Sequence, residues 1–198
     1  MALTYPLTFP TVNGESIIKS CNLKLVHSAA MTQSTTNYKQ LITNYTNARW
    51  EAEITLRPLD RIEGMAFSAF ITALRGVTQT FQFGNPLMVQ TGRTASHTGS
   101  TTIGVGSATM SITLGDSNGL PAGSHFEVNN ELYMTLEDIS TSVGFVSIAP
   151  ALKTEVTAAQ SLIIDLPKTS WRLSRNDIGW DINQAGFYDF SFNCIEAQ

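Results

Sequence analysis

Histidine and cysteine are the side chains best suited to bind a transition metal, and this sequence places them far apart. His27, His97 and His125 each lack a second histidine, a cysteine or a carboxylate at the spacing that a metal site requires. His125 heads an expected hairpin and is interpreted as a turn residue, and His97 lies in the polar tract TASHTGS, where we expect it to be solvated. Cys21 and Cys194 fall in alternating apolar runs, so we expect both to be buried as small hydrophobic side chains. We therefore predict no metal site.

Carboxylates and glycine-rich loops could support acid–base chemistry or phosphate binding, but their placement favours neither. Glu51 and Glu53 lie side by side on the outer face of one expected strand, whereas a glycosidase needs two carboxylates in unlike environments around a pocket. The segment IGVGSAT has no lysine and no helix after it, and Asp116 and Asn118 in LGDSNGLPAG are typical of tight turns. We predict no catalytic residue, no cofactor and no enzymatic activity, and a small hydrolase is the weakest alternative.

The composition favours a protein that packs against other proteins. Charged residues make up 14% of the 198 residues, against roughly 25% in typical soluble domains, so repulsion between copies is weak. The net charge is −4 and the twelve lysines and arginines are scattered, which argues against a nucleic-acid surface. The N-terminus does not read as a secretion signal, and no apolar stretch is long enough to span a bilayer. We expect a soluble protein made in the cytoplasm, without nucleic-acid or membrane partners.

Two segments in the first third of the chain alternate in the way that a half-buried strand requires. In residues 20–27 and 49–56, alternate side chains are predicted to point to the same face of a sheet. The inward set of the second segment is expected to be Trp50, Ala52, Ile54 and Leu56. The tract between the two segments, residues 28–47, is rich in Ser, Thr and Asn and has no lasting period. It is either a long loop, which is uncommon without a function, or two irregular strands.

One helix is predicted, over about residues 58–75. Pro58 suits its first turn, where a missing N–H is harmless, and Gly76 supplies the stop. Apolar residues recur at spacings of three and four and predict the buried stripe. They are Leu59, Ile62, Ala66, Ala69, Phe70, Ala73 and Leu74. We expect this helix to cover one face of a sheet.

The remaining sequence divides into an insert and a closing segment. Residues 86–167 are rich in Gly, Ser and Thr, contain four or five short expected strands, and are bounded by prolines. One expected hairpin, HFEVNNELYMTL, turns at Asn129-Asn130. Three aromatic residues are interpreted as the core of this insert: Phe126, Tyr133 and Phe145. The predicted fold is mainly β with one helix, in which residues 1–85 and 168–198 form a discontinuous β-sandwich or barrel domain interrupted by a small inserted β-barrel or sandwich, residues 86–167.

The order of the elements resembles a family of virion proteins. YKQLITNYTNARWEAEITLRPL precedes the helix, LRGVTQTFQFGNP follows it, and WRLSRNDIGWDINQAGFYDFSFNCIEA closes the chain after the insert. This order is similar to that of the distal tail proteins and M-type minor tail proteins of long-tailed, non-contractile bacteriophages, over residues 1–85 and 168–198. The resemblance implies a homo-oligomeric ring, usually a hexamer, at the tail tip of the virion. Its implied partners are the tail tube protein and the hub or baseplate proteins, with tail fibres as a further expected partner.

Contact residues for such a ring are predicted in the polar tract. A hairpin over residues 31–47 would build the subunit edge or contact the tube, and Tyr38, Gln40, Tyr45 and Arg49 are its contact candidates. The alternative for this tract is a mobile loop. The alternative function is a glycan- or receptor-binding module carried by the insert, although the insert has no obvious aromatic platform.

Overall fold

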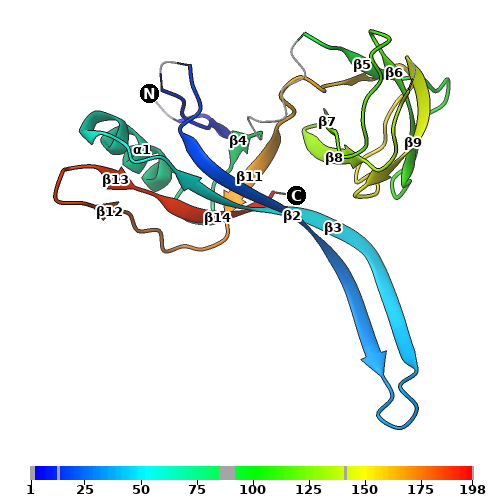
Figure 1. Cartoon of the computed structure of the whole chain (residues 1–198), viewed down its shortest axis with the longest axis horizontal. Helices are drawn as coiled ribbons and strands as arrows, with labels where there is room; N and C mark the ends of the chain where they lie inside the picture. The colour runs from blue at the N-terminus through cyan, green and yellow to red at the C-terminus, as the bar shows by residue number, and fades with distance from the viewer. Residues whose placement is uncertain (1–2, 13, 85–91, 141, 198) are drawn as a thin grey trace.

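The structure, a computed structural model, describes residues 3–12, 14–84, 92–140 and 142–197. Within these residues the chain forms two six-stranded sheets, one α-helix and a separate two-stranded hairpin. The prediction of a mainly β fold with one helix is confirmed, and the second sheet curls into a nearly closed barrel (Figure 1). No helix among the described residues is long and apolar enough to cross a membrane.

The first sheet, called the body sheet below, combines strands from the two ends of the sequence. Its strands, in spatial order, are β1 (Leu7–Thr8), β4 (Phe81–Phe83), β11 (Thr169–Leu173), β14 (Ser191–Glu196), β3 (Gln40–Leu56) and β2 (Ile18–Gln33). β1 and β4 run parallel, and the other neighbouring pairs are antiparallel. Because β4 pairs with β11, the chain leaves the body sheet at Phe83 and returns to it at Thr169 on the next strand.

Helix α1 (Arg61–Ala73) covers one face of the body sheet (Figure 1). The side chains of β3 that are buried on this face are Trp50, Ala52, Ile54 and Leu56. The alternation predicted for this strand is therefore confirmed. From the helix, Phe67 packs edge-on against Phe190 with ring centroids 4.7 Å apart. Aromatic pairs of this geometry contribute about 0.5–1.5 kcal/mol beyond the area that they bury.

The helix begins three residues later than predicted, because Asp60 and not Pro58 marks its start. Asp60 accepts a hydrogen bond from the backbone N–H of Glu63 at 2.8 Å, and Glu63 accepts one from the backbone N–H of Asp60 at 3.3 Å. This reciprocal capping box satisfies two backbone donors at the helix start. At the other end the helix stops at Ala73 with Leu74 as its C-cap. Arg75, one residue before the predicted stop at Gly76, is the first residue with a positive φ, +51°, and Gly76 follows at +64°.

The predicted buried stripe of the helix was partly wrong. Leu59 and Leu74, which flank the helix, are buried. Three predicted stripe residues are exposed: Ile62, Ala66 and Ala69. The helix instead buries Gly64, Phe67 and Ile71. The reason is the position of Tyr188, whose ring lies so close to Gly64 that an added Cβ would sit 2.4 Å from its Cγ atom.

The second sheet, called the barrel below, spans residues 95–163. Its strands, in spatial order, are β10 (Ser161–Leu162), β5 (Ala95–His97), β6 (Thr109–Leu114), β9 (Val143–Ala149), β8 (Glu131–Thr135) and β7 (His125–Val128). Glu127 and Ile163 exchange two backbone hydrogen bonds, 2.8 and 2.9 Å long, which bring β7 back to the end of β10. The predicted hairpin is confirmed: β7 and β8 meet at Asn129 and Asn130, which have φ values of +55° and +64°.

The interpretation of three aromatic residues as the barrel core was right for two and wrong for the third. Phe126 and Tyr133 are buried and stack with ring centroids 5.6 Å apart. Phe145 is 72% exposed. On β9 the buried positions are Val146 and Ile148, so Phe145 falls in the opposite phase of the strand and points outward.

The interpretations of His97 and His125 were also wrong, because both side chains are buried. His97 lies in β5, and its Nδ1 atom is 2.8 Å from the carbonyl oxygen of Ser111. His125 is the first residue of β7 and lies against Trp50, with ring centroids 5.3 Å apart. Burial lowers the pKa of His125, and the backbone of Gly123 opposes this shift only in part.

Specific contacts hold the barrel against the body sheet. The indole Nε1 of Trp50 donates a hydrogen bond to the carbonyl oxygen of Leu132 at 2.8 Å. The ammonium of Lys153 pairs with the buried carboxylate of Glu196 at 2.5 Å. These contacts join two strands of the body sheet, β3 through Trp50 and β14 through Glu196, to the barrel, so the barrel has a defined position on the sheet.

Candidate assembly arm

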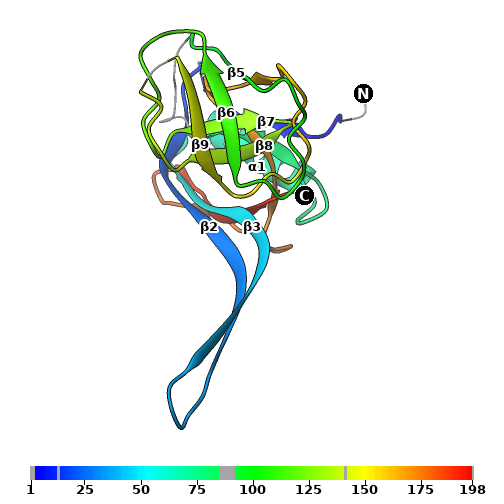
Figure 2. The same ribbon diagram turned by 90° about the vertical axis from the view of Figure 1, so that its right-hand side faces the viewer.

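The feature that sets this molecule apart is a long β-hairpin, called the arm below and formed by residues 28–47. Strands β2 and β3 are 16 and 17 residues long, so β3 alone measures about 55 Å along its path. β14 pairs with β3 only from Glu51 to Thr55. In the arm, β2 and β3 therefore have only each other as strand partners within the described chain. Figures 1 and 2 show the arm projecting well beyond the rest of the molecule.

The polar tract forms two strands and not a long loop. Met31 pairs with Ile42 and Ala30 with Thr43, in continuous antiparallel register out to Gln33 and Gln40. The register shifts between His27 and Ala29, where the arm leaves the body sheet. The segment QLITNYTN, rich in β-branched and aromatic residues, favours a strand. The polar composition of the tract concealed this pattern, because neither face of the arm is buried.

The arm exposes large apolar and aromatic side chains. Every residue from Ser28 to Tyr45 is exposed. The large apolar and aromatic side chains among them are Met31, Tyr38, Leu41, Ile42 and Tyr45, with Met31 and Ile42 62% and 64% exposed. A two-stranded hairpin without a packed face is marginally stable in water. An arm of this kind gains order when a partner covers its apolar side chains or pairs with its strand edges.

The arm is nearly free of charge. Residues 28–47 contain one lysine, Lys39, and no carboxylate. Lys39 lies next to the turn, where Ser34 donates a backbone hydrogen bond to its carbonyl oxygen at 2.9 Å. Burial of the arm against a partner therefore has a small desolvation cost. Because its one charge is positive, the arm favours a negatively charged partner over a positive one.

Three of the four predicted contact residues lie on the arm, and the fourth lies at its base. Tyr38 is in the turn, Gln40 begins β3 next to the turn, and Tyr45 is further along the same strand; all three are exposed. Arg49 pairs with Val26 in the body sheet, about 30 Å along β3 from Gln40. The structure thus brings Tyr38 and Gln40 together and separates Arg49 from them.

The sequence interpretation missed the aliphatic contact candidates, Met31, Leu41 and Ile42. The available signal was their presence in a tract otherwise composed of polar residues, since isolated aliphatic side chains in such a tract have no core to enter. Their cross-strand arrangement could not be read from the sequence, because the register depends on the turn between Ser34 and Lys39.

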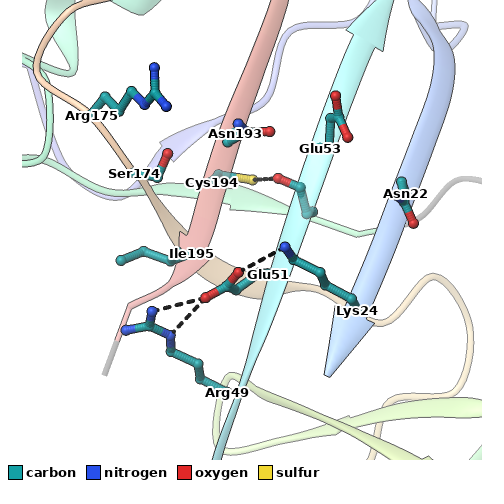
Figure 3. Close-up of a pocket in the computed structure, with 11 residues that line it drawn as sticks. Asn22, Lys24, Arg49, Glu51, Glu53, Ser174, Arg175, Asn193, Cys194 and Ile195 are labelled. Atoms are coloured by element: carbon teal, nitrogen blue, oxygen red, sulfur yellow. Dashed lines mark hydrogen bonds and ion pairs between the residues drawn. The ribbon is translucent and has the colours of Figure 1, made fainter. Parts of the chain in front are cut away.

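Arg49 belongs to a small ion-pair cluster on the open face of the body sheet. Its guanidinium contacts the carboxylate of Glu51 at 2.9 Å, and the ammonium of Lys24 contacts the same carboxylate at 3.2 Å (Figure 3). The hydrogen bonds from Arg49, and then those from Lys24, hold the pKa of Glu51 below its ordinary value. Both cations are largely exposed, so the cluster orders this face and contributes little stability.

A shallow pocket of about 380 Å³ lies beside this cluster, between β2, β3 and β14 (Figure 3). Glu53 and Arg175 line it along with the cluster. The thiol of Cys194 also borders it, but this thiol points to Ala52 and donates a hydrogen bond to its carbonyl oxygen at 3.5 Å. Burial raises the pKa of Cys194, so the thiol is a poor nucleophile. Across the described residues, no three metal-ligating side chains gather into a site.

No protein-family model and no curated protein sequence matches the chain. The arm and the surfaces around it are therefore the features from which we infer a function.

Proposed function

We propose that this protein is a structural virion protein, a subunit of the ring at the tip of a bacteriophage tail that joins the tail tube to the hub or baseplate. One observation carries the proposal: the arm extends beyond the fold with apolar side chains exposed on both of its strands. The order of the elements supports it, since a hairpin, a helix and an interrupted sheet follow one another as in the tail-tip proteins that the sequence resembles.

The arm suits a ring because a ring needs an interface between two different surfaces of the same subunit. Such a heterologous interface lets each copy bind the next, and closure of the series produces a ring. A projecting hairpin supplies one of the two surfaces without disturbing the core. The low fraction of charged residues, 14%, keeps repulsion between neighbouring copies small.

Negative-stain imaging and light scattering of the purified chain test this proposal. We expect the wild-type chain to form a closed ring, with six copies as the expectation from the resemblance. A variant in which Asn-Gly replaces residues 29–44 shortens the arm while keeping a hairpin turn. We expect this variant to remain folded and to run as a single chain.

The matched control for the shortened arm is Phe145→Ala, which removes an exposed apolar side chain from the barrel. This control is expected to form rings like the wild type. A wild-type chain that stays monomeric, or a shortened-arm variant that still forms rings, would contradict the proposal.

A second candidate function, glycan binding by the barrel, is favoured by the exposure of Phe145. This ring lies on the outer face of the barrel, where its strand partner is Ser111, so an apolar ring and one hydroxyl group lie side by side. A sugar that binds there should raise the melting temperature of the wild type and not that of Phe145→Ala. A panel of sugars without effect on the wild type would rule this candidate out.

A further inference from the structure

A second hairpin also carries exposed apolar side chains. Residues 177–189, called the acidic hairpin below, contain β12 (Asp181–Ile182) and β13 (Tyr188–Asp189). Its exposed apolar side chains are Trp180, Ile182 and Phe187. The same residues include three aspartates and no lysine or arginine. The acidic hairpin thus combines apolar contact area with a local charge of −3.

The acidic hairpin is anchored firmly to the body. Leu59 and Tyr188 exchange two backbone hydrogen bonds, each 2.9 Å long. Trp180 packs against the buried ring of Phe190 with centroids 5.8 Å apart. Behind Tyr188, the close approach of Gly64 allows helix α1 to support the same hairpin. A surface held in this way presents its exposed side chains in a fixed arrangement.

The register of this hairpin places like charges directly opposite one another. Asp181 pairs with Asp189 across the two strands. Like charges at opposed positions of a sheet destabilise it. Among the described residues, neither carboxylate forms an ion pair. A cation brought by a partner would relieve this repulsion.

The arm cannot reach the acidic hairpin of its own subunit. β14, which follows the acidic hairpin, pairs through Ser191 with Thr55 near one end of β3. Gln40, at the other end of β3, lies next to the turn of the arm. The path along β3 between Thr55 and Gln40 is about 50 Å. Figure 1 shows the arm and the β12–β13 hairpin leaving the body sheet at opposite ends.

We propose that the arm of one copy docks on the acidic hairpin of the next copy, with Met31 and Ile42, which share one face of the arm, packing against Ile182 and Phe187. Lys39, next to the turn of the arm, meets the opposed carboxylates Asp181 and Asp189. The occupant is a second copy of this chain, because the chain itself supplies both an apolar arm of charge +1 and an apolar surface of charge −3. The contact is heterologous, so it propagates from copy to copy. This inference rests on the proposed ring function and names the surfaces that build the ring.

Three variants, each with a glutamate introduced at one position, test the docking. Ile42→Glu places a carboxylate on the arm, Ile182→Glu places one on the acidic hairpin, and Val105→Glu places one on an exposed barrel turn as the matched control. An unpaired carboxylate in an apolar contact is unfavourable, and on the arm it also faces charge of the same sign. By light scattering, we expect Ile42→Glu and Ile182→Glu each to have the mass of one chain, 21.6 kDa. Val105→Glu is expected to assemble like the wild type.

Mixing the two defective variants gives the sharpest result. The Ile182→Glu copy retains an intact arm, and the Ile42→Glu copy retains an intact acidic hairpin. We expect one copy of each variant to form a dimer that cannot extend further, so the mixture should contain a species of twice the mass of one chain. Circular dichroism confirms that each variant is folded, and Ile182→Ser replaces Ile182→Glu if the latter does not fold.

The possible outcomes separate this inference from the ring proposal. If the wild type assembles and Ile182→Glu assembles equally well, the arm docks elsewhere and only the docking is overturned. A mixture that stays at the mass of one chain also overturns it. If the wild type itself remains a single chain, both the docking and the ring proposal are overturned.

Discussion

The arm and the barrel are both built from antiparallel strands, but the barrel buries its apolar side chains and the arm exposes them. The barrel buries Met110, Ile112, Phe126 and Val146 completely. The arm exposes Met31 and Ile42 as a facing pair. The barrel therefore has its own core, and the arm has none.

This difference predicts that buried side chains of the barrel determine the stability of a single copy and that exposed side chains of the arm determine assembly. A buried side chain in the barrel stabilises the fold of a single copy, at about 1.5–3 kcal/mol for a fully buried aliphatic or aromatic residue. An exposed one on the arm contributes its apolar surface only when a partner covers it. Substitutions in the two regions should therefore change different measurements, and the following predictions test that separation from the largest expected effect to the smallest.

The largest contrast is expected between Phe126→Ala and Ile42→Ala. Phe126 is fully buried, so its truncation should lower the free energy of unfolding by about 3–5 kcal/mol. Ile42 is exposed in the single copy, so its truncation should change that free energy by less than about 0.5 kcal/mol. Denaturant unfolding at a dilution where the protein is a single chain measures both. Equal losses would mean that the arm packs within its own subunit.

An intermediate effect is expected where the barrel meets the body sheet. Lys153→Ala leaves the carboxylate of Glu196 buried without its cation, which should lower the free energy of unfolding by about 3 kcal/mol. Lys24→Ala removes an exposed partner of Glu51 and should have an effect of about 0–1 kcal/mol. Thermal unfolding compares the two. A small loss for Lys153→Ala would show that the barrel is less firmly held than the contacts indicate.

The smallest effect is expected from acidification through His125. Burial lowers its pKa in the folded protein below the ordinary value of 6.5, so the unfolded chain takes up a proton first as the pH falls. The stability contributed by neutral His125 is therefore complete above pH 6.5 and decreases below it. His125→Phe keeps a ring against Trp50 and removes this titration.

The measurement for His125 is the melting temperature between about pH 7 and about pH 5. The wild type should lose more stability over this interval than His125→Phe. Glu51 does not interfere, because its pKa lies below 4.5 in the folded protein and its contribution is lost only at lower pH. Parallel pH profiles for the two proteins would show that His125 is not responsible.

The parts of the fold that the sequence predicted are those in which local pattern and burial agree. The alternation of Trp50, Ala52, Ile54 and Leu56 survives in β3 because one face of that strand is buried. The turn at Asn129-Asn130 depends on the residues of the turn itself, so it could also be predicted from the sequence. The helix was placed correctly but its buried face was not, because the approach of Tyr188 to Gly64 is a tertiary contact that leaves no periodic signal.

For the same reason, the candidate site could be predicted only in part from the sequence. A hairpin over residues 31–47 was predicted as the contact region, and Tyr38, Gln40 and Tyr45 lie on the arm. Its strands have no buried face, so the alternation that identifies a strand was missing. The acidic hairpin was not recognised as a surface at all, because its exposure depends on how β13 is anchored beside the helix.

Amide hydrogen exchange of the arm in the assembled protein tests the central claim most directly. We expect backbone amides of residues 29–44 to be protected in the wild-type oligomer and to exchange rapidly in the single-chain Ile42→Glu variant, while barrel amides behave alike in both. Rapid exchange of the arm in an assembled wild-type particle would contradict the claim that this hairpin holds the copies together.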